Sequence, residues 1–301
     1  MVKSVQETLV HGQDVRGQDG AAAEPASGLA SGIDWADAFD NMSHVPAAAE
    51  MIRAGTEEAA AFRENASNAA FDLAYGPGPR QVLDIFWPSC EPKGLSVFLH
   101  GGYWQKLSKQ DWSHMAAGAL ARGWAMAVPS YTLAPEARLG AMVGEVARAV
   151  TLAAGKVEGP IRIAGHSAGG HLAMRLACAD SPLPAEVMAR LERVVSISGL
   201  HDLRPLRLSP MNAVLGIDAA EAQAESPALL PPAVPGPRVI LWAGGEERPE
   251  LIRQTALMAE AWAGRSPRLL RLYENGRNHF DVVEGLFDAA SPLVEAFLGR
   301  D

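Results

Sequence analysis

The chain has 301 residues, of which 48% are hydrophobic, so it can bury a sizeable core in one large α/β domain or two small ones. Its net charge of −9 comes from acidic and basic residues mixed along the chain, and no basic stripe indicates a nucleic-acid partner. The only cysteines, Cys90 and Cys178, form no metal-binding spacing, so we expect neither a disulfide scaffold nor a metal site. No apolar run approaches the ~20 residues of a membrane span, and no secretory signal is visible, which favours a cytoplasmic protein without a membrane partner.

Residues 1–32 are rich in small and polar residues and poor in large apolar ones, so we expect a flexible extension there. A single domain is expected over residues 33–301. Its first part, residues 33–64, has a helical pattern that is broken near Pro46, and we expect this stretch to pack over or beside the rest. Two runs with alternating apolar and polar residues then flank the turn Gly76-Pro77-Gly78-Pro79, which predicts an antiparallel strand pair.

From residue 95 onward, β-prone runs alternate with apolar runs at helical spacing, which predicts a mostly parallel sheet with helices on both faces. The proline-rich residues 200–237 interrupt this alternation and predict a small, loop-rich cap. The eight expected strands are 71–75, 81–87, 95–99, 124–128, 161–164, 193–198, 238–243 and 268–273. The expected helices of the alternating part are 112–122, 139–154, 170–177, 250–264 and 280–298. This order is typical of the α/β-hydrolase fold.

The most informative motif is Gly165-His166-Ser167-Ala168-Gly169, a G-x-S-x-G sequence between a predicted strand and a predicted helix. In that context the glycines allow a strained turn, and the serine hydroxyl projects from the C-terminal edge of the sheet. The free N–H groups at the start of the following helix can face a developing negative charge. The motif therefore predicts Ser167 as a nucleophile.

A serine needs a base, and the base needs an orienting acid; in this fold they follow the serine in the order acid, then histidine. His279 is the only histidine after position 201, and it follows the last predicted strand, so it is the candidate base. For the acid we prefer Glu247, in the loop after strand 238–243. Its neighbour Glu246 and, less favoured, Asp202 after the preceding strand remain alternatives.

The sequence His100-Gly101-Gly102-Tyr103-Trp104 follows the predicted strand 95–99 and fits an oxyanion loop. Paired glycines let the backbone N–H groups approach a substrate oxygen closely. We therefore expect Gly101 and Gly102, together with the N–H of Ala168, to stabilise the oxyanion.

With these motifs together, residues 75–298 resemble the kynurenine formamidases (arylformamidases) of the α/β-hydrolase type, within the esterase and lipase group. The resemblance is carried by the His100–Trp104 loop, the G-x-S-x-G motif and three further stretches, namely residues 198–206, 249–254 and 278–281. It implies Ser167, Glu247 and His279 as the triad. The family usually has aspartate at the acid position, and glutamate also serves as the triad acid in this fold.

The resemblance implies hydrolysis of N-formylkynurenine to kynurenine and formate, without a cofactor or metal. Tyr103, Trp104 and Phe280 are candidates for an aromatic wall around the substrate, and Arg204 is a candidate partner for its carboxylate. A carboxylesterase for short-chain or aryl esters is the alternative function, and a non-catalytic binding relative is a third hypothesis. Apart from the small-molecule substrate, a second copy of the chain, in a homodimer, is the one partner left open.

Overall fold

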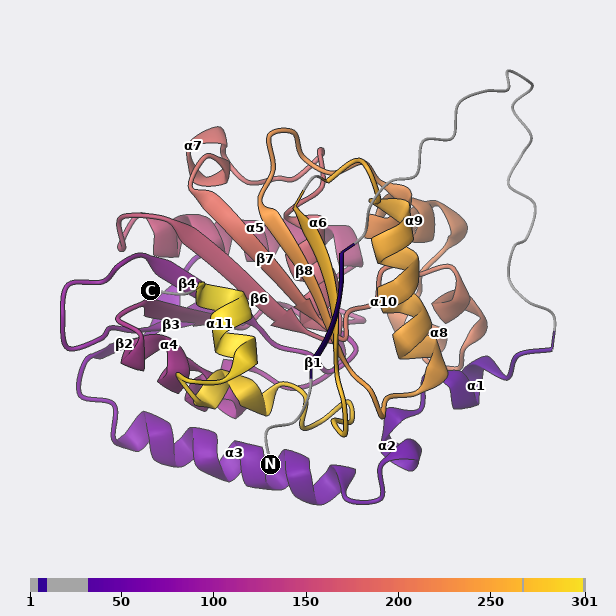
Figure 1. Ribbon diagram of the computed structural model, residues 1–301, viewed down its shortest axis with the longest axis horizontal. Coiled ribbons are helices and arrows are strands. Elements are labelled where there is room, and N and C mark those ends of the chain that lie inside the picture. The colour runs from indigo at the N-terminus through magenta and orange to yellow at the C-terminus, as the bar shows by residue number, and fades with distance from the viewer. Residues whose placement is uncertain (1–4, 10–31, 267, 300–301) are drawn as a thin grey trace.

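The computed structural model describes residues 5–9, 32–266 and 268–299, and the strands within them form one nine-stranded sheet (Figure 1). The strands lie in the order β1-β9-β8-β7-β6-β4-β5-β3-β2. Their bounds are β1 Val5–Leu9, β2 Ala69–Ala74, β3 Val82–Phe86, β4 Leu95–Leu99, β5 Ala125–Pro129, β6 Ile161–His166, β7 Leu191–Ile197, β8 Arg238–Gly244 and β9 Leu269–Glu274.

The sheet is mostly parallel, as the alternation of strands and helices predicts. Strands β5, β4, β6, β7, β8 and β9 run parallel, and β1, β2 and β3 pair antiparallel with their neighbours. The expectation of eight strands is corrected by β1, which lies within the predicted extension and pairs with β9. Strand β9 would otherwise be the sheet edge, and an exposed edge offers unpaired N–H and C=O groups to another segment. The rest of that extension, residues 1–4 and 10–31, lies outside the described residues.

Two hydrophobic clusters form the core, one on each side of the sheet, because successive side chains of a strand point to opposite faces. On β4, Leu95, Val97 and Leu99 belong to one cluster and Phe98 belongs to the other. The first cluster packs against α5 Leu139–Ala154, α6 Ala168–Arg175 and α10 Pro249–Ala261. The second packs against η1 Lys109–Ala116, α4 Ala117–Ala121, η4 Glu284–Phe287 and α11 Pro292–Leu298.

The helical pattern of residues 33–64 forms three helices, α1 Trp35–Ala38, α2 Asn41–His44 and α3 Ala48–Glu64. The expected break near Pro46 falls between α2 and α3. Helix α3 packs along η1 and runs along the lower edge of the molecule in Figure 1. These three helices are called the roof segment below, because they cover the site described in the next section.

Two of the expected helices differ in the structure. Residues 112–122 form the end of a 3₁₀ helix, η1, followed by the short α4. The expected helix 280–298 is divided into η4 and α11, because Ser291 caps α11 and Pro292 occupies its first position.

Residues 200–237 contain only short pieces, as the expected loop-rich cap implies: η2 Pro205–Leu208, α8 Asn212–Leu215, α9 Ala219–Ala224 and η3 Pro227–Leu229. The remaining helix is α7 Ala185–Met188.

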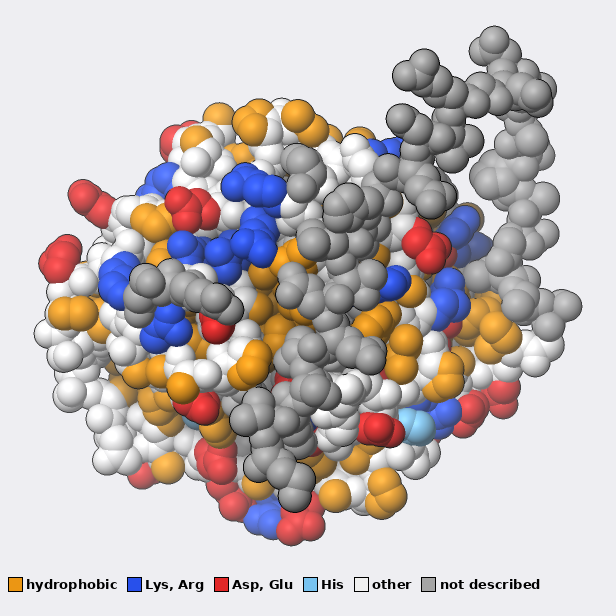
Figure 2. Space-filling model, viewed as in Figure 1, with side chains coloured by type: hydrophobic (Ala, Val, Ile, Leu, Met, Phe, Trp, Pro, Cys, Tyr) orange, Lys and Arg blue, Asp and Glu red, His pale blue; other side chains and the backbone are white. Residues whose placement is uncertain are grey.

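The face of the molecule shown in Figure 2 carries acidic and basic side chains interspersed with apolar ones. In the described part of the chain, no helix is both long and apolar enough to cross a membrane. Among the same residues, no cluster of three or more histidine, cysteine, aspartate or glutamate side chains is arranged to hold a metal ion.

Candidate active site

Ser167 lies in a strained turn between β6 and α6. Its backbone has φ 55° and ψ −118°, a conformation that L-residues rarely adopt. The turn requires both glycines of the motif. A Cβ atom at Gly165 would lie 2.0 Å from the carbonyl oxygen of Gly169, and one at Gly169 would lie 2.0 Å from that of Leu99. The motif is therefore fixed by the close packing of α6 against β4 and β6.

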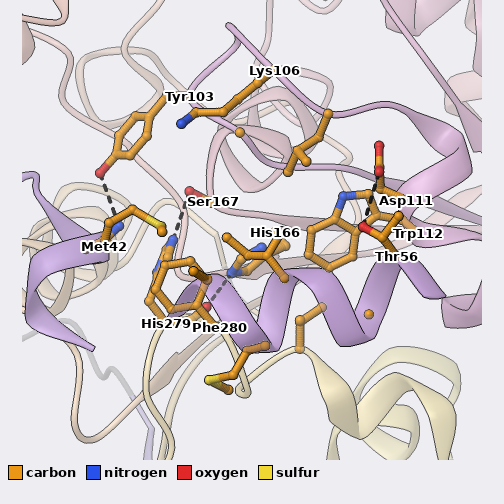
Figure 3. Close-up of a pocket in the computed structure, with 18 of the residues that line it drawn as sticks. Met42, Thr56, Tyr103, Lys106, Asp111, Trp112, His166, Ser167, His279 and Phe280 are labelled. Carbon is orange, nitrogen blue, oxygen red and sulfur yellow. Dashed lines mark hydrogen bonds between the residues drawn. The ribbon is translucent and has the colours of Figure 1, made fainter. Parts of the chain in front are cut away.

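The structure brings Ser167, His279 and Glu247 together in one hydrogen-bonded chain (Figure 3 shows the serine and the histidine). His279 Nε2 lies 3.1 Å from Ser167 Oγ, and His279 Nδ1 lies 2.8 Å from Glu247 Oε2. All three residues are at least 95% buried. Because a carboxylate only accepts hydrogen bonds, Nδ1 carries the proton and Nε2 is free to accept one from the serine hydroxyl.

Glu247 is the only one of the three candidate acids that contacts His279. Its second oxygen, Oε1, accepts hydrogen bonds from the hydroxyl of Ser198 and from the N–H of Gly244. By contrast, the Glu246 side chain is exposed, and Asp202 forms a bidentate ion pair with Arg204. Both carboxylate oxygens of Glu247 are thus hydrogen-bonded. Oε2 contacts His279, and Oε1 contacts the side chain of Ser198 and the backbone of Gly244. This role of Ser198 was not predicted from the sequence, although Ser198 is the first residue of one of the stretches that carry the family resemblance.

His166 contacts both the backbone and the ring of His279. Its Nε2–H donates to the carbonyl oxygen of His279 at 2.9 Å, and the centroids of the two imidazole rings are 4.7 Å apart. Burial, together with the nearby His279, lowers the pKa of His166 well below its ordinary value of 6.5. His166 therefore stays neutral at physiological pH and holds the His279 backbone through a single hydrogen bond.

The loop after β4 lies directly against Ser167. A Cβ atom at Gly101 would lie 3.1 Å from Ser167 Cβ, so only a glycine fits there without displacing the turn. Gly102 has φ 105°, and a Cβ atom there would lie 2.3 Å from the carbonyl oxygen of Lys106. Ala168 is the first residue of α6, so its N–H has no acceptor within the helix. Gly101 and Ala168, two of the residues expected to hold the oxyanion, therefore lie against the serine, and Gly102 lines the same cavity as Ser167.

Ser167 and His279 open into a cavity of about 890 Å³ between the roof segment, η1 and the loop that follows His279. Most of its lining is apolar, with aromatic side chains at both ends. Figure 3 shows Tyr103 and Met42 on one side of Ser167, and Trp112 and Thr56 on the other side beyond His166. The lining also includes Met51, Ile52, Met115, Phe280, Val283 and Phe287.

Tyr103 connects the oxyanion loop to the roof segment. Its hydroxyl donates to the carbonyl oxygen of Phe39 at 2.7 Å and accepts from Asn41 Nδ2 at 3.1 Å. The loop that carries the acid is connected to the same segment. Arg248 forms a bidentate ion pair with Asp37 and donates to the carbonyl oxygen of Asp40. The roof segment is thus bound to the loops on both sides of the site, which the sequence pattern of residues 33–64 did not indicate.

Of the four residues expected to contact the substrate, Tyr103 and Phe280 line the cavity and the other two do not. Trp104 is completely buried in the core, edge-on to His171 at 5.1 Å. Tyr103 and Trp104 both have positive φ, and this turn sends their side chains in different directions. Arg204 is paired with Asp202, two residues earlier, and does not line the cavity. The expectations for Trp104 and Arg204 were therefore wrong.

The sequence and the fold of this chain are similar to those of known proteins. A family model described as the alpha/beta hydrolase fold matches residues 96–215. A kynurenine formamidase of Salmo salar is 27% identical over 85% of this chain and 87% of its own length. That of Danio rerio is 24% identical over 88% of this chain and 91% of its own. A crystal structure of a candidate thioesterase from Silicibacter sp. TM1040 is 41% identical, covers 89% of this chain and 100% of its own, and superposes with a TM-score of 0.84.

The similarity to the candidate thioesterase extends over nearly the whole chain, and the family model covers the strand–elbow–helix region that contains Ser167. The chain is therefore a hydrolase that belongs to the α/β-hydrolase family, and within that family it is similar to the kynurenine formamidases.

Proposed function

We propose that this protein is a serine hydrolase that removes the formyl group from an aryl formamide, with N-formylkynurenine as its substrate and kynurenine and formate as its products. The observation that carries the proposal is the hydrogen-bonded chain from Ser167 through His279 to Glu247, which opens into an aromatic-lined cavity. The similarity to two kynurenine formamidases over most of the chain supports the choice of substrate.

In the first half of the reaction, Ser167 Oγ attacks the formyl carbon while His279 Nε2 takes the hydroxyl proton. Glu247 stabilises the imidazolium that results. The N–H groups of Gly101, Gly102 and Ala168 donate to the negatively charged oxygen of the tetrahedral intermediate. His279 then gives its proton to the nitrogen of the substrate, the C–N bond breaks, and the aryl amine leaves a formyl ester on Ser167.

In the second half, water attacks the formyl ester and gives a proton to His279 Nε2. The second tetrahedral intermediate collapses, the proton returns to Ser167 Oγ, and formic acid leaves and ionises in water to formate and a proton. Every proton transfer within the site uses the same histidine nitrogen. His166 therefore matters to the proposal, because its hydrogen bond to the His279 carbonyl holds the backbone that carries this ring.

The experiment that tests this function compares kcat/KM for N-formylkynurenine, an aryl acetate and an aryl octanoate, which form a series of increasing acyl length. We expect N-formylkynurenine to exceed an aryl acetate and an aryl octanoate to be the poorest substrate. The absence of hydrolysis of any aryl formamide, or a kcat/KM that rises with acyl length, would overturn the formamidase assignment. It would leave a serine hydrolase of another specificity.

A second candidate, an ester or thioester hydrolase, is favoured by three observations. The 41%-identical structure is described as a candidate thioesterase, and the cavity of about 890 Å³ has room for a larger group than a formyl. In addition, Trp104 lies in the core and does not narrow the acyl site, as a side chain beside the oxyanion loop would. Short aryl esters and acyl thioesters therefore belong in the same acyl series as alternative substrates.

A further inference from the structure

We infer that Lys106 determines specificity by binding the carboxylate of an amino-acid tail on the aromatic substrate. The inference rests on the proposed function for the identity of that tail, because N-formylkynurenine carries a carboxylate and an ammonium group at the end remote from its formamide. From the sequence, Arg204 was the candidate for this part, but in the structure it pairs with Asp202 and does not line the cavity.

Most of the charged side chains that line the cavity are acidic. Five carboxylates lie in its wall, and among the described lining residues Lys106 is the only lysine or arginine. A ligand with a free carboxylate would therefore meet net repulsion along the wall except near Lys106. The acidic lining residues are Asp40, Glu50, Glu58, Asp111 and Glu284.

The other cations around the site already have partners. Arg248 is paired with Asp37, and Arg277 forms ion pairs with Glu274, Asp281 and Glu284. For Lys106, by contrast, no carboxylate of the described residues lies within ion-pair distance, and its side chain is exposed. Lys106 can therefore bind a ligand carboxylate without breaking an existing ion pair.

The backbone that carries Lys106 is rigidly connected to the oxyanion loop. The N–H of Lys106 donates to the carbonyl oxygen of Gly102 at 3.2 Å, and Arg80 Nη2 holds the carbonyl oxygen of Leu107 at 2.5 Å. Figure 3 shows the Lys106 side chain reaching over the cavity beside Tyr103, on the Ser167 side. The ammonium group is thus carried by the same loop that faces the scissile carbonyl, on a flexible stem that can follow the tail.

The test uses two formamides that differ only in the tail. N-Formyl-L-kynurenine has the amino-acid tail, whereas N-(2-acetylphenyl)formamide has the same ring, formamide and ketone with a methyl group in place of the tail. For Lys106→Met we expect kcat/KM on N-formylkynurenine to fall on the order of tenfold through KM, and Lys106→Glu should lower it further. Activity on the tail-less formamide should stay within about twofold, and Lys106→Arg should retain most of the activity on both.

Lys156→Glu is the matched control, because it makes the same charge change at an exposed position just after α5, away from the cavity. It should leave both substrates unchanged. Equal losses on the two formamides in Lys106→Met, or no loss on either, would overturn the inference.

A binding measurement separates this inference from the proposed function. Kynurenine and 2-aminoacetophenone are compared as competitive inhibitors of 4-nitrophenyl acetate hydrolysis, which needs no formamide turnover. We expect Lys106→Met to weaken inhibition by kynurenine about tenfold and to leave inhibition by 2-aminoacetophenone unchanged. If the wild-type protein hydrolyses neither formamide, the proposed function fails, and this inhibition pattern still decides the role of Lys106. Equal inhibition constants for kynurenine in the variant and the wild-type protein would contradict it.

Discussion

The turn that carries Ser167 and the roof segment both form the site, but they are held in place in different ways. The turn is fixed by local packing, since Gly165 and Gly169 have no space for a side chain. The roof segment is fixed by contacts between residues far apart in the chain, such as Tyr103 with Phe39. The chemistry therefore depends on a locally determined turn, and the shape of the cavity depends on a few long-range polar contacts.

This difference predicts that mutations in the two regions change different quantities. Changes to the turn or to its hydrogen-bonded partners should lower kcat or unfold the protein. Changes to the contacts of the roof segment should chiefly raise KM, because that segment lines the cavity and supplies no group to the hydrogen-bonded chain.

The largest effect is expected for Ser167→Ala, which removes the nucleophile. The variant should keep its fold and lose on the order of 10⁴ to 10⁶ in kcat, by analogy with other serine triads. Steady-state kinetics together with circular dichroism would measure both. Retention of more than about a tenth of the activity would exclude Ser167 as the nucleophile.

Glu247→Gln should come next, with a loss of about 10² to 10⁴ in kcat. A neutral amide no longer fixes the tautomer of His279 or stabilises its cationic form. Glu246→Gln is the matched control, because it makes the same chemical change one residue away on an exposed side chain. Similar losses in the two variants would argue against Glu247 as the acid.

Gly169→Ala tests the packing that fixes the turn. The added Cβ would lie 2.0 Å from a backbone oxygen, and we expect a loss of about 3 kcal/mol in the free energy of unfolding. Gly144→Ala, within α5, is the control, because the nearest atom to its Cβ would be a side-chain nitrogen at 3.6 Å. Denaturant titration should find the control as stable as the wild type or slightly more stable. An unchanged stability for Gly169→Ala would mean that the turn is less tightly packed than described.

On the side of the roof segment, Arg248→Met should raise KM about three- to tenfold with a smaller change in kcat. It removes the bidentate ion pair with Asp37 and the hydrogen bond to the Asp40 carbonyl oxygen. Arg253→Met, in the helix that begins directly after Arg248, is the control, because Arg253 pairs with Glu250 outside the cavity. A purely kcat effect in Arg248→Met would show that the roof segment acts on the acid loop and not on the cavity.

The smallest effect concerns pH. Burial lowers the pKa of His171, in α6, to about 3, against an ordinary value of 6.5. Between these values the unfolded chain binds a proton that the folded protein does not, so stability is present above about pH 6.5 and is lost as the pH falls. His171→Gln should make thermal stability less dependent on pH between pH 6.5 and 4.5, by about 1 kcal/mol at pH 5.5. An unchanged pH dependence would contradict the buried, neutral state of His171.

The sequence predicted the parts of the molecule that short stretches determine. The alternation of strands and helices predicted the parallel sheet, and the G-x-S-x-G motif predicted the serine turn. The order of acid and histidine along the chain predicted His279, which contacts Ser167, and an acid that contacts His279. The order alone could not distinguish Glu247 from Glu246 as that acid. That choice is made by Ser198 and Gly244, whose contacts with Glu247 depend on the fold.

The errors concern residues whose side-chain direction or pairing is not indicated by hydrophobic periodicity or by a short motif. Trp104 follows Tyr103 directly, and only the positive φ angles of this loop direct one side chain to the cavity and the other to the core. Arg204 is engaged by Asp202, and no hydrophobic pattern indicates that pairing. Strand β1 was not predicted, because it pairs with β9, which lies far from it in the sequence and comes beside it only in the folded sheet.

The central claim is that Ser167 is the nucleophile of a cavity that accepts N-formylkynurenine. Fluorophosphonate labelling with mass spectrometry tests both parts in one measurement. We expect a single adduct on the peptide that contains Ser167, formed more slowly in the presence of N-formylkynurenine and in Glu247→Gln. An adduct on another residue, no adduct, or labelling that N-formylkynurenine does not slow would contradict the claim.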